Sequence, residues 1–261
     1  MKPNFAPLAL KNAGVELEDI IDGASGPPFR ATNFAHISRL YRRIATGILL
    51  VSSDPQDFYR YLFNSSRAFV YFLEQAKDES KITSMATAYF DAVACRDREG
   101  ERRLAAGSRH TLNPGEEYEE DFLYVSILMR HFTLGNSAKD LEGALDEFEG
   151  YVKGNPDPRF AVVEALVTAD QKGFDDAIAV AIKHIVKSRD VALDAELVHP
   201  DEASTSSRIN VEVLAWIELA ERAGLKVARE YPLAPSAARL FHRIAFPPPD
   251  DWRHPSGFST L

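Results

Sequence analysis

Apolar residues recur every three or four positions along most of the chain, and this spacing predicts a protein built almost wholly from α-helices. The clearest stripe begins at Phe34 and continues through Ile37, Leu40 and Ile44 to Ile48. Alternating apolar and polar positions, which are typical of half-buried strands, are nearly absent. We therefore expect an all-α fold, an antiparallel multi-helix bundle or helical array, in a single domain with little or no β-structure.

Start and stop signals divide this pattern into separate helices. Asp54-Pro55 reads as an N-cap followed by a proline at the first helical position, and prolines break the chain at 113–115 and 155–158. Gly224 follows the last strongly periodic segment, where glycine commonly ends a helix. Between these signals we expect helices at about 34–49, 55–73, 81–93, 116–132, 137–152, 160–170, 174–190 and 209–223.

The remaining segments carry weaker patterns. We expect residues 1–29 to be a partly irregular N-terminal segment and residues 30–245 to be the helical domain, with possible halves meeting near residue 155. Residues 246–261, FPPPDDWRHPSGFSTL, are too rich in proline for an ordinary helix and are expected to form an extended or mobile tail. The polar stretch 194–207 is expected to be a loop, and 225–231, LKVAREY, is the best candidate for a strand or an extended connector.

The charge of the chain limits its partners. The 261 residues carry a formal net charge of −9. A general nucleic-acid binder needs a cationic surface that displaces phosphate counterions, so nucleic-acid binding is not expected. An acidic chain instead suits a basic partner, because electrostatic attraction speeds their encounter. The N-terminus shows no signal-peptide pattern, and no apolar run approaches the ~20 residues of a membrane span, so we expect a cytoplasmic protein that does not enter membranes.

Motifs for cofactor, metal or covalent chemistry are missing from the sequence. The stretch GASG at 23–26 lacks the Lys-Ser/Thr of a phosphate-binding loop, and no Gly-x-Ser-x-Gly elbow is present. The seven histidines show no metal-ligand spacing, and His184 lies on a strongly periodic helix, where we expect it to pack. Paired carboxylates such as Glu119 and Glu120 are typical of solvated helix faces. We expect no cofactor, no metal and no enzymatic activity.

The single cysteine, Cys95, opens the most charged stretch in the first half of the chain, CRDREGERRL. Its neighbours Arg96 and Arg98 could lower the pKa of the thiol, as nearby cations do. A small buried apolar side chain on a helix is the interpretation we favour, because unpaired cysteines are commonly buried.

The same stretch begins a run of segments that resembles a known family. In MATAYFDAVACRDREGERRLAAGSRHTL, which starts at Met85, a helix of alternating small and large apolar residues leads into Arg96-Asp97. The segments EEYEEDFLYVSILMRHFTLGN, VVEALVTADQKGFDDAIAVAIKHI and VEVLAWIELAERAGLKVAREYPLAP follow in order. From Met85 to Leu240 the chain thereby resembles the immunity protein 49 family, a group of mostly helical proteins encoded beside polymorphic toxins. The first third of the chain offers little to compare.

The resemblance implies an immunity protein that binds a cognate protein toxin and neutralises it by occlusion, without catalysis. It makes Arg96, Asp97, His184 and Gly224 structural positions of the family, and we interpret Arg96 and Asp97 as a hinge or a buried ion pair at a helix end. Many toxins that attack nucleic acids are basic, so acidic helices would suit such a partner. The candidate toxin-binding residues are Glu116, Glu117, Glu119, Glu120, Asp121, Asp140, Glu142, Asp146 and Glu147.

Two other functions remain open at this level. A helical-repeat scaffold or adaptor that binds a cellular protein would be favoured by a tandem repeat seen on structural superposition. A cofactor-independent enzyme would be favoured by a buried pocket in which Glu, Asp and His side chains converge. The sequence leaves open the chemistry of the toxin, the residues that touch it and the oligomeric state.

Overall fold

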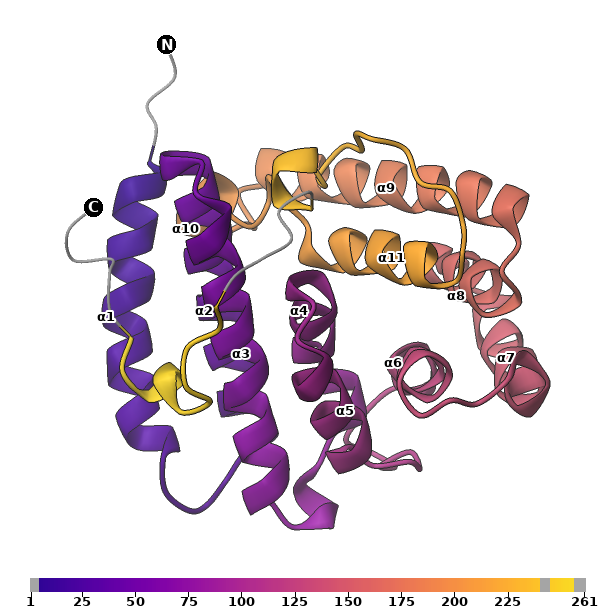
Figure 1. The fold of residues 1–261 in the computed structure, drawn as a ribbon, viewed down its shortest axis with the longest axis horizontal. Helices are drawn as coiled ribbons and strands as arrows, with labels where there is room; N and C mark the ends of the chain where they lie inside the picture. Colours follow the sequence, from indigo (N-terminus) through magenta and orange to yellow (C-terminus); the bar gives the residue numbers. More distant parts are fainter. Residues whose placement is uncertain (1–4, 240–244, 256–261) are drawn as a thin grey trace.

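The computed structural model describes residues 5–239 and 245–255, and these form eleven α-helices and no strand (Figure 1). The predicted all-α fold class is confirmed. The strand candidate 225–231 is not a strand; Tyr231 makes one isolated bridge, with Ala234. Residues 1–4, 240–244 and 256–261 lie outside the described residues, and they include Leu240 and the end of the predicted tail.

Three antiparallel helices lie side by side at one end of the molecule, on the left in Figure 1. They are α1 (Ala6–Ala24), α2 (Ala31–Ser52) and α3 (Pro55–Gln75). The N-terminal segment is more regular than its pattern suggested, because the buried face of α1 is made largely of small residues such as Ala9 and Ala13. Small side chains give little hydrophobic periodicity but allow helices to approach closely. At Gly47 of α2, an added Cβ would lie 2.7 Å from the Leu10 side chain.

The chain between α3 and α4 is not the single helix that its pattern predicts. Two short 3₁₀ turns, at Asp78–Ser80 and Thr83–Met85, precede α4 (Ala88–Cys95). Local polar contacts explain the difference. The Thr83 hydroxyl donates to the Arg109 carbonyl over 2.9 Å, and the Glu117 carboxylate accepts from the Ser84 N–H over 2.7 Å. The Ser84 N–H is a group that a continuous helix would use in its own ladder, and so is the Lys81 carbonyl, which accepts from the Asn113 side chain over 3.1 Å.

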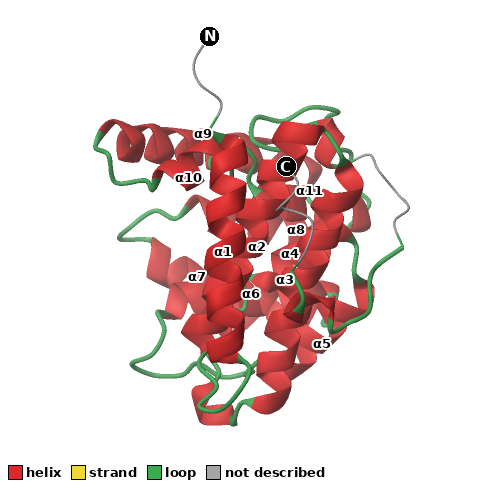
Figure 2. Cartoon of the chain, turned by 90° about the vertical axis from the view of Figure 1, so that its left-hand side faces the viewer, coloured by secondary structure: helices red, strands yellow, loops and turns green. Residues whose placement is uncertain are grey.

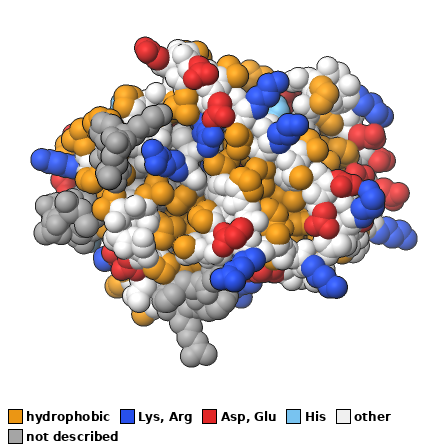
Figure 3. All heavy atoms as spheres, turned by 90° about the horizontal axis from the view of Figure 1, so that it is seen from above, with side chains coloured by type: hydrophobic (Ala, Val, Ile, Leu, Met, Phe, Trp, Pro, Cys, Tyr) orange, Lys and Arg blue, Asp and Glu red, His pale blue; other side chains and the backbone are white. Residues whose placement is uncertain are grey.

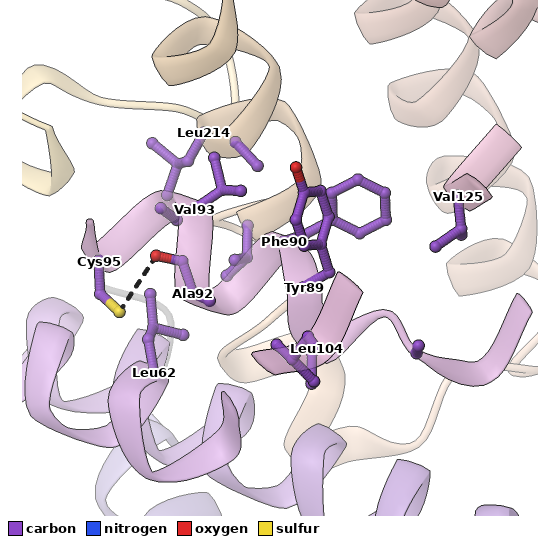
Figure 4. Packing of buried hydrophobic residues seen from close by; sticks show 14 of the residues in the cluster. Leu62, Tyr89, Phe90, Ala92, Val93, Cys95, Leu104, Val125 and Leu214 are labelled. Carbon is purple, nitrogen blue, oxygen red and sulfur yellow. Dashed lines mark hydrogen bonds between the residues drawn. The ribbon is translucent and has the colours of Figure 1, made fainter. Parts of the chain in front are cut away.

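Helix α4 lies at the centre of the core, and every one of its residues is buried. Figure 4 shows its side chains among Leu62 of α3, Leu104 of α5 (Arg98–Gly107), Val125 of α6 (Glu119–Phe132) and Leu214 of α11 (Val211–Arg222). The Cys95 thiol donates to the Ala92 carbonyl over 3.6 Å, and burial raises its pKa well above the ordinary value. The prediction that Cys95 is a small buried side chain on a helix is therefore confirmed.

The second half of the chain adds α7 (Ala138–Val152), α8 (Pro158–Thr168) and α9 (Gln171–Asp194), seen on the right in Figure 1. Helix α7 starts with a capping box between Ser137 and Asp140, and α8 starts at Asp157, whose side chain caps it. Helix α11 packs on both α4 and α8, so elements from both sides of residue 155 contribute to one core. Figure 2 shows the same arrangement from the side of α1.

Two segments expected to be loose are packed. The polar stretch 194–207 contains α10 (Pro200–Ser204), which lies on α1, where Asn12 donates to Asp201 over 3.1 Å. The prediction of a plain loop was wrong because five residues are too few for a visible periodicity. In the described part of the C-terminal tail, a 3₁₀ turn at Asp251–Arg253 buries Trp252, whose carbonyl accepts from the Tyr41 hydroxyl over 2.5 Å. A further 3₁₀ turn covers Ser236–Ala238.

Candidate functional site

A cavity of about 420 Å³ opens between the C-terminal end of α7, the α7–α8 connection, α9 and α11. The break at 155–158 that the sequence signals forms one wall, with Pro156 and Pro158 lining it. Tyr151 supplies aromatic surface, Ile185 of α9 supplies aliphatic surface, and Trp216 borders the cavity but is only 1 % exposed. Such a volume lies within the range of ~300–1,000 Å³ that is usual for ligand pockets.

Arg159 is the one guanidinium among the described residues that line this cavity, and it is held by acids of its own chain. Its Nε lies 2.7 Å from the Asp157 carboxylate, and its Nη2 lies 2.8 Å from Asp121. Its Cζ also lies 4.8 Å from the centre of the Tyr124 ring. These two carboxylates raise its pKa, so the cation stays charged but is neutralised internally.

A chain of hydrogen bonds behind the cavity ends on a glutamate. The Trp216 indole N–H donates to the Tyr124 hydroxyl over 2.8 Å, and that hydroxyl donates to Glu212. Burial raises the pKa of the Glu212 carboxyl above its ordinary value, and the bond from Tyr124 and the nearby charge of Arg159 offset part of this rise. Glu212 and Arg159 also line a second, smaller cavity of about 150 Å³ on the side of α2.

Two sets of predicted acids meet at the mouth of the cavity, around the exposed ring of Tyr151. Burial, followed by the charges of Glu119, Glu147 and Glu120, raises the pKa of the Tyr151 hydroxyl. Glu120 itself lines the cavity. Within the described residues these three glutamates make no hydrogen bond or ion pair. We call Glu119, Glu120 and Glu147 the acidic rim.

The other predicted acids have different positions. Three of them are used inside the protein: Glu117 accepts from the backbone N–H groups of Ser84 and Asn113, Asp121 pairs with Arg159, and Asp140 belongs to the capping box of α7. Glu116, Glu142 and Asp146 are exposed. The nine candidate residues therefore do not form one uniform surface, and six of them lie outside the acidic rim.

Arg96 and Asp97 are adjacent in sequence but bind different partners. Asp97 is 3 % exposed; its carboxylate caps α5 by accepting from the Gly100 N–H over 2.9 Å and lies 2.7 Å from Nη2 of Arg67 on α3. Arg96, the left-handed residue that ends α4 with φ 62°, donates from Nε to Glu218 of α11 over 2.8 Å. The buried ion pair is thus Arg67–Asp97, and each residue of the Arg-Asp pair ties its helix end to a different helix.

The charges around the start of α5 continue into α11. Arg222 binds Glu101 through two parallel contacts of 2.7 Å each, and Glu218 receives Arg96, Arg98 and Arg222. Burial raises the pKa of Glu101 to about 8. We call the whole set the internal charge cluster: Arg67, Arg96, Asp97, Arg98, Glu101, Glu218 and Arg222.

The two remaining family positions also differ from one another. Gly224 adopts φ 80° after α11, and the contacts Leu225 N–H to Ala220 O (2.9 Å) and Gly224 N–H to Glu221 O (3.1 Å) form a Schellman cap. His184 is exposed and lines the cavity rather than packing in the core. Helical periodicity placed it on the right helix, but α9 extends past its neighbours, so its second half lies largely on the surface.

Four residues of the cavity were missed from the sequence: Tyr151, Arg159, Glu212 and Trp216. They come from the end of α7, the start of α8 and the start of α11. The proline-rich break at 155–158 was the available signal, since a break between amphipathic helices leaves a place where their ends do not cover one another. Nothing local in the sequence shows that α11 supplies the back wall.

The upper face of the molecule carries acidic and basic side chains near one another, with hydrophobic surface between them (Figure 3). The net negative charge of the chain is therefore not spread evenly over this face, and acidic and basic side chains alternate across it. No described helix has the length and hydropathy needed to cross a bilayer. The described residues also contain no cluster of three His, Cys, Asp or Glu side chains that could hold a metal ion.

Fold and site together define an all-α protein with one core, an open charged cavity and a set of unpaired acids at its mouth. A family model described as immunity protein 49 matches residues 45–238, about three quarters of the chain. The protein belongs to this family, as the resemblance predicted. The match begins earlier than Met85, so it includes the end of α2 and all of α3, where the sequence alone offered little to compare. No curated protein and no solved structure matches the chain.

Proposed function

We propose that this chain is an immunity protein that binds a cognate protein toxin and neutralises it by covering the active site of the toxin, without catalysis. Membership of the immunity protein 49 family supports the role. The observation that carries the location is the acidic rim, where Glu119, Glu120 and Glu147 gather around Tyr151 from two helices. A toxin that acts inside the cell would be met in the cytoplasm.

The composition of this surface fits a basic protein partner. Carboxylates that have no partner within their own chain lose no internal contact when they pair across an interface. Tyr151 and Tyr118, 45 % and 71 % exposed, flank these acids, and tyrosine is enriched among residues that anchor protein interfaces. Electrostatic attraction from the acidic rim would mainly speed the encounter, while the aromatic residues would slow dissociation.

The enzymatic alternative has one observation in its favour, because Glu120, His184 and Glu212 all line the cavity. Acid–base catalysis uses groups that orient one another by hydrogen bonds. In the described residues His184 bonds to neither glutamate, and Glu212 is bonded to Tyr124 instead. This lining suits binding better than catalysis. The adaptor alternative is weakened by helix lengths that run from 5 to 24 residues, which do not suggest a stacked repeat.

Co-expression with the toxin encoded in the neighbouring reading frame tests the role directly. We expect the toxin alone to stop growth and the wild-type chain to restore it by forming a complex that co-purifies. Growth arrest that persists although the immunity chain is folded and abundant would contradict the proposal. Restored growth without a complex would contradict occlusion and favour an enzymatic or indirect role.

Charge reversal tests the location. The variant Glu119→Lys, Glu120→Lys, Glu147→Lys should associate with the toxin about tenfold more slowly at low salt, and its rate should depend less on salt. The matched control reverses Glu18, Asp19 and Asp22, exposed acids of α1 outside the family match. Equal association rates for the rim variant and the wild type at both salt concentrations would leave these acids as ordinary solvated surface.

A further inference from the structure

The walls of the cavity combine apolar surface with negative charge. Tyr151, Trp216 and Ile185 lie beside the two prolines of the α7–α8 connection. Glu120 stands at the mouth and Glu212 at the back, where the hydrogen-bonded chain from Trp216 through Tyr124 ends. A ligand that fills this space needs an apolar body to cover the walls and a polar end that carries positive charge.

The charges of the lining do not cancel. Arg159 is already bound by Asp157 and Asp121, so two carboxylates neutralise one guanidinium. Glu212 receives one neutral hydroxyl and lies near the charges of Arg159 and Arg42, whereas Glu120 receives no donor from the described residues. The cavity is therefore short of positive charge in a partly enclosed place, where an unpaired carboxylate costs more than it does in water.

Aromatic walls favour the same kind of ligand. A guanidinium or ammonium within about 6 Å of an aromatic face is attracted by the ring, most strongly by tryptophan. The aliphatic stem of lysine or arginine can also cover apolar surface while its charged end reaches a carboxylate. In this chain Arg159 already lies over Tyr124, which shows that aromatic rings of this region accept a cation.

We propose that the cavity receives one lysine or arginine side chain from the surface of the toxin, with its charged end between Glu120 and Glu212 and its stem against Tyr151 and Ile185. This assignment rests on the proposed function for the source of the side chain. The acidic rim then steers a basic surface toward the mouth, and the inserted side chain fixes the register of the complex.

A peptide probe tests the chemistry of the cavity without the toxin. The chain has two tryptophans, Trp216 in the cavity wall and Trp252 in the core at the other end of the molecule. Their indole N–H signals can be followed by proton–nitrogen correlation NMR and assigned with Trp252→Phe. Acetyl-Gly-Arg-Gly-amide should move the Trp216 signal in a saturable way and leave the Trp252 signal in place. The matched citrulline peptide, which has the same shape without the charge, should move neither signal.

Variants link the shift to the two glutamates. Glu120→Gln, Glu212→Gln should weaken binding of the arginine peptide at least about tenfold, since a charge-assisted contact is replaced by a neutral one. Glu18→Gln, Asp22→Asn, with the same change of charge on α1, should bind as the wild type does. Glu120→Gln alone serves if the double variant unfolds, because Glu120 has no internal partner to lose. Equal shifts with arginine and citrulline, or no saturable shift of Trp216, would overturn the proposal.

Growth rescue separates this inference from the proposed function. Rescue by the wild type, together with clear loss of rescue by a folded Glu120→Gln, Glu212→Gln variant, supports both. If the wild type rescues and the double variant rescues equally well, the toxin does not use the cavity and the inference is overturned while the immunity role stands. If the wild type fails to rescue, the immunity role falls and with it the toxin as the source of the side chain, whatever the peptide shows about cavity chemistry.

Discussion

The internal charge cluster and the acidic rim both contain carboxylates, but those of the cluster are paired with arginines and those of the rim are not. In the internal charge cluster, Glu101 and Glu218 each receive at least two arginines, and Asp97 is capped, paired and almost fully buried. In the acidic rim, three glutamates face a tyrosine and make no pair within the described residues. The internal charge cluster contains the most densely charged stretch of sequence, yet the carboxylates that are free to bind a partner are those of the acidic rim.

The comparison teaches that a charged stretch has to be judged by its partners elsewhere in the chain. In CRDREGERRL, Arg96 and Arg98 are both bound by Glu218, which α11 supplies from more than a hundred residues away. Pairing of this kind fixes how α4, α5 and α11 meet, although its net stabilisation is modest once desolvation is counted. Acids without such partners are the ones left for an interface.

The largest expected effect comes from breaking the buried pair of the internal charge cluster. Asp97→Ala leaves Arg67 charged and buried and removes the cap of α5, so we expect a loss of about 3–5 kcal/mol in the free energy of unfolding. Asp54 provides the control, since it caps α3 and forms no ion pair within the described residues: Asp54→Ala should cost about 1 kcal/mol. Urea unfolding followed by circular dichroism measures both. An unchanged midpoint for Asp97→Ala would show that the pair does not hold the helices together.

The pH dependence of stability gives the next effect. Because burial raises the pKa of Glu101 to about 8, the folded chain keeps a proton that the unfolded chain releases near its ordinary value. Stability should therefore fall as the pH rises from about 5 to about 8, at roughly 1.4 kcal/mol for each unit of pKa difference at most. Glu101→Gln removes this titration, so the difference in unfolding free energy between wild type and variant should change in that window. A difference that stays constant would mean that Glu101 is ionised throughout.

A smaller loss of stability is expected from changing Gly224, which ends the helix that carries Arg222 of the internal charge cluster. Gly224 holds φ 80° directly after α11, which ends at Arg222. An added Cβ would meet no atom within 4 Å, so Gly224→Ala reports conformational strain alone. We expect a cost of about 1–2 kcal/mol in thermal unfolding. The comparison variant is Gly143→Ala on the exposed face of α7, where the same added methyl meets no atom in a helical backbone and should be neutral or stabilising.

The smallest effect is expected at the acidic rim. Glu119→Gln, Glu147→Gln removes two charges that have no internal partner, and the unfolding free energy should stay within about 0.5 kcal/mol of the wild type. The same variant should lose speed in toxin association. A clear loss of stability here would erase the contrast between the two regions, because the rim would then hold the fold together as the internal charge cluster does.

Most of the fold could be predicted from the sequence because most helices carry large residues on one face and recognisable caps. Asp54 caps α3 as predicted, with its carboxylate 2.8 Å from the Gln56 N–H. Helix α1 and helix α10 were missed for physical reasons: the first packs through alanines, and the second is too short for a period to appear. The helix predicted from residue 81 started too early because the side chains of Glu117 and Asn113 bind the backbone there.

The candidate site was predicted only in part, and the missing part depends on tertiary contacts. The acidic residues of α6 and α7 correctly indicated that these two helices contribute to the candidate site. The sequence does not show which of these acids is free to bind a partner. Asp121 is occupied by Arg159 and Glu117 by the backbone of Ser84, and both contacts arise only in the folded chain. The structure also divides two residues that the sequence joins, since Arg96 and Asp97 bind different helices.

The burial of Trp252 sets the order in which the protein can be completed during synthesis. Helices α1 to α3 are made first and can pair as soon as they emerge, since each contacts its neighbour in sequence. The rings of Phe34 and Tyr71, however, both pack against the ring of Trp252, whose backbone carbonyl bonds to Tyr41 across 211 positions. Until Trp252 leaves the ribosome, the aromatic side chains of α2 and α3 on which it packs remain uncovered. The nascent chain therefore completes the packing of its first-made region only after its last-made segment has been synthesised.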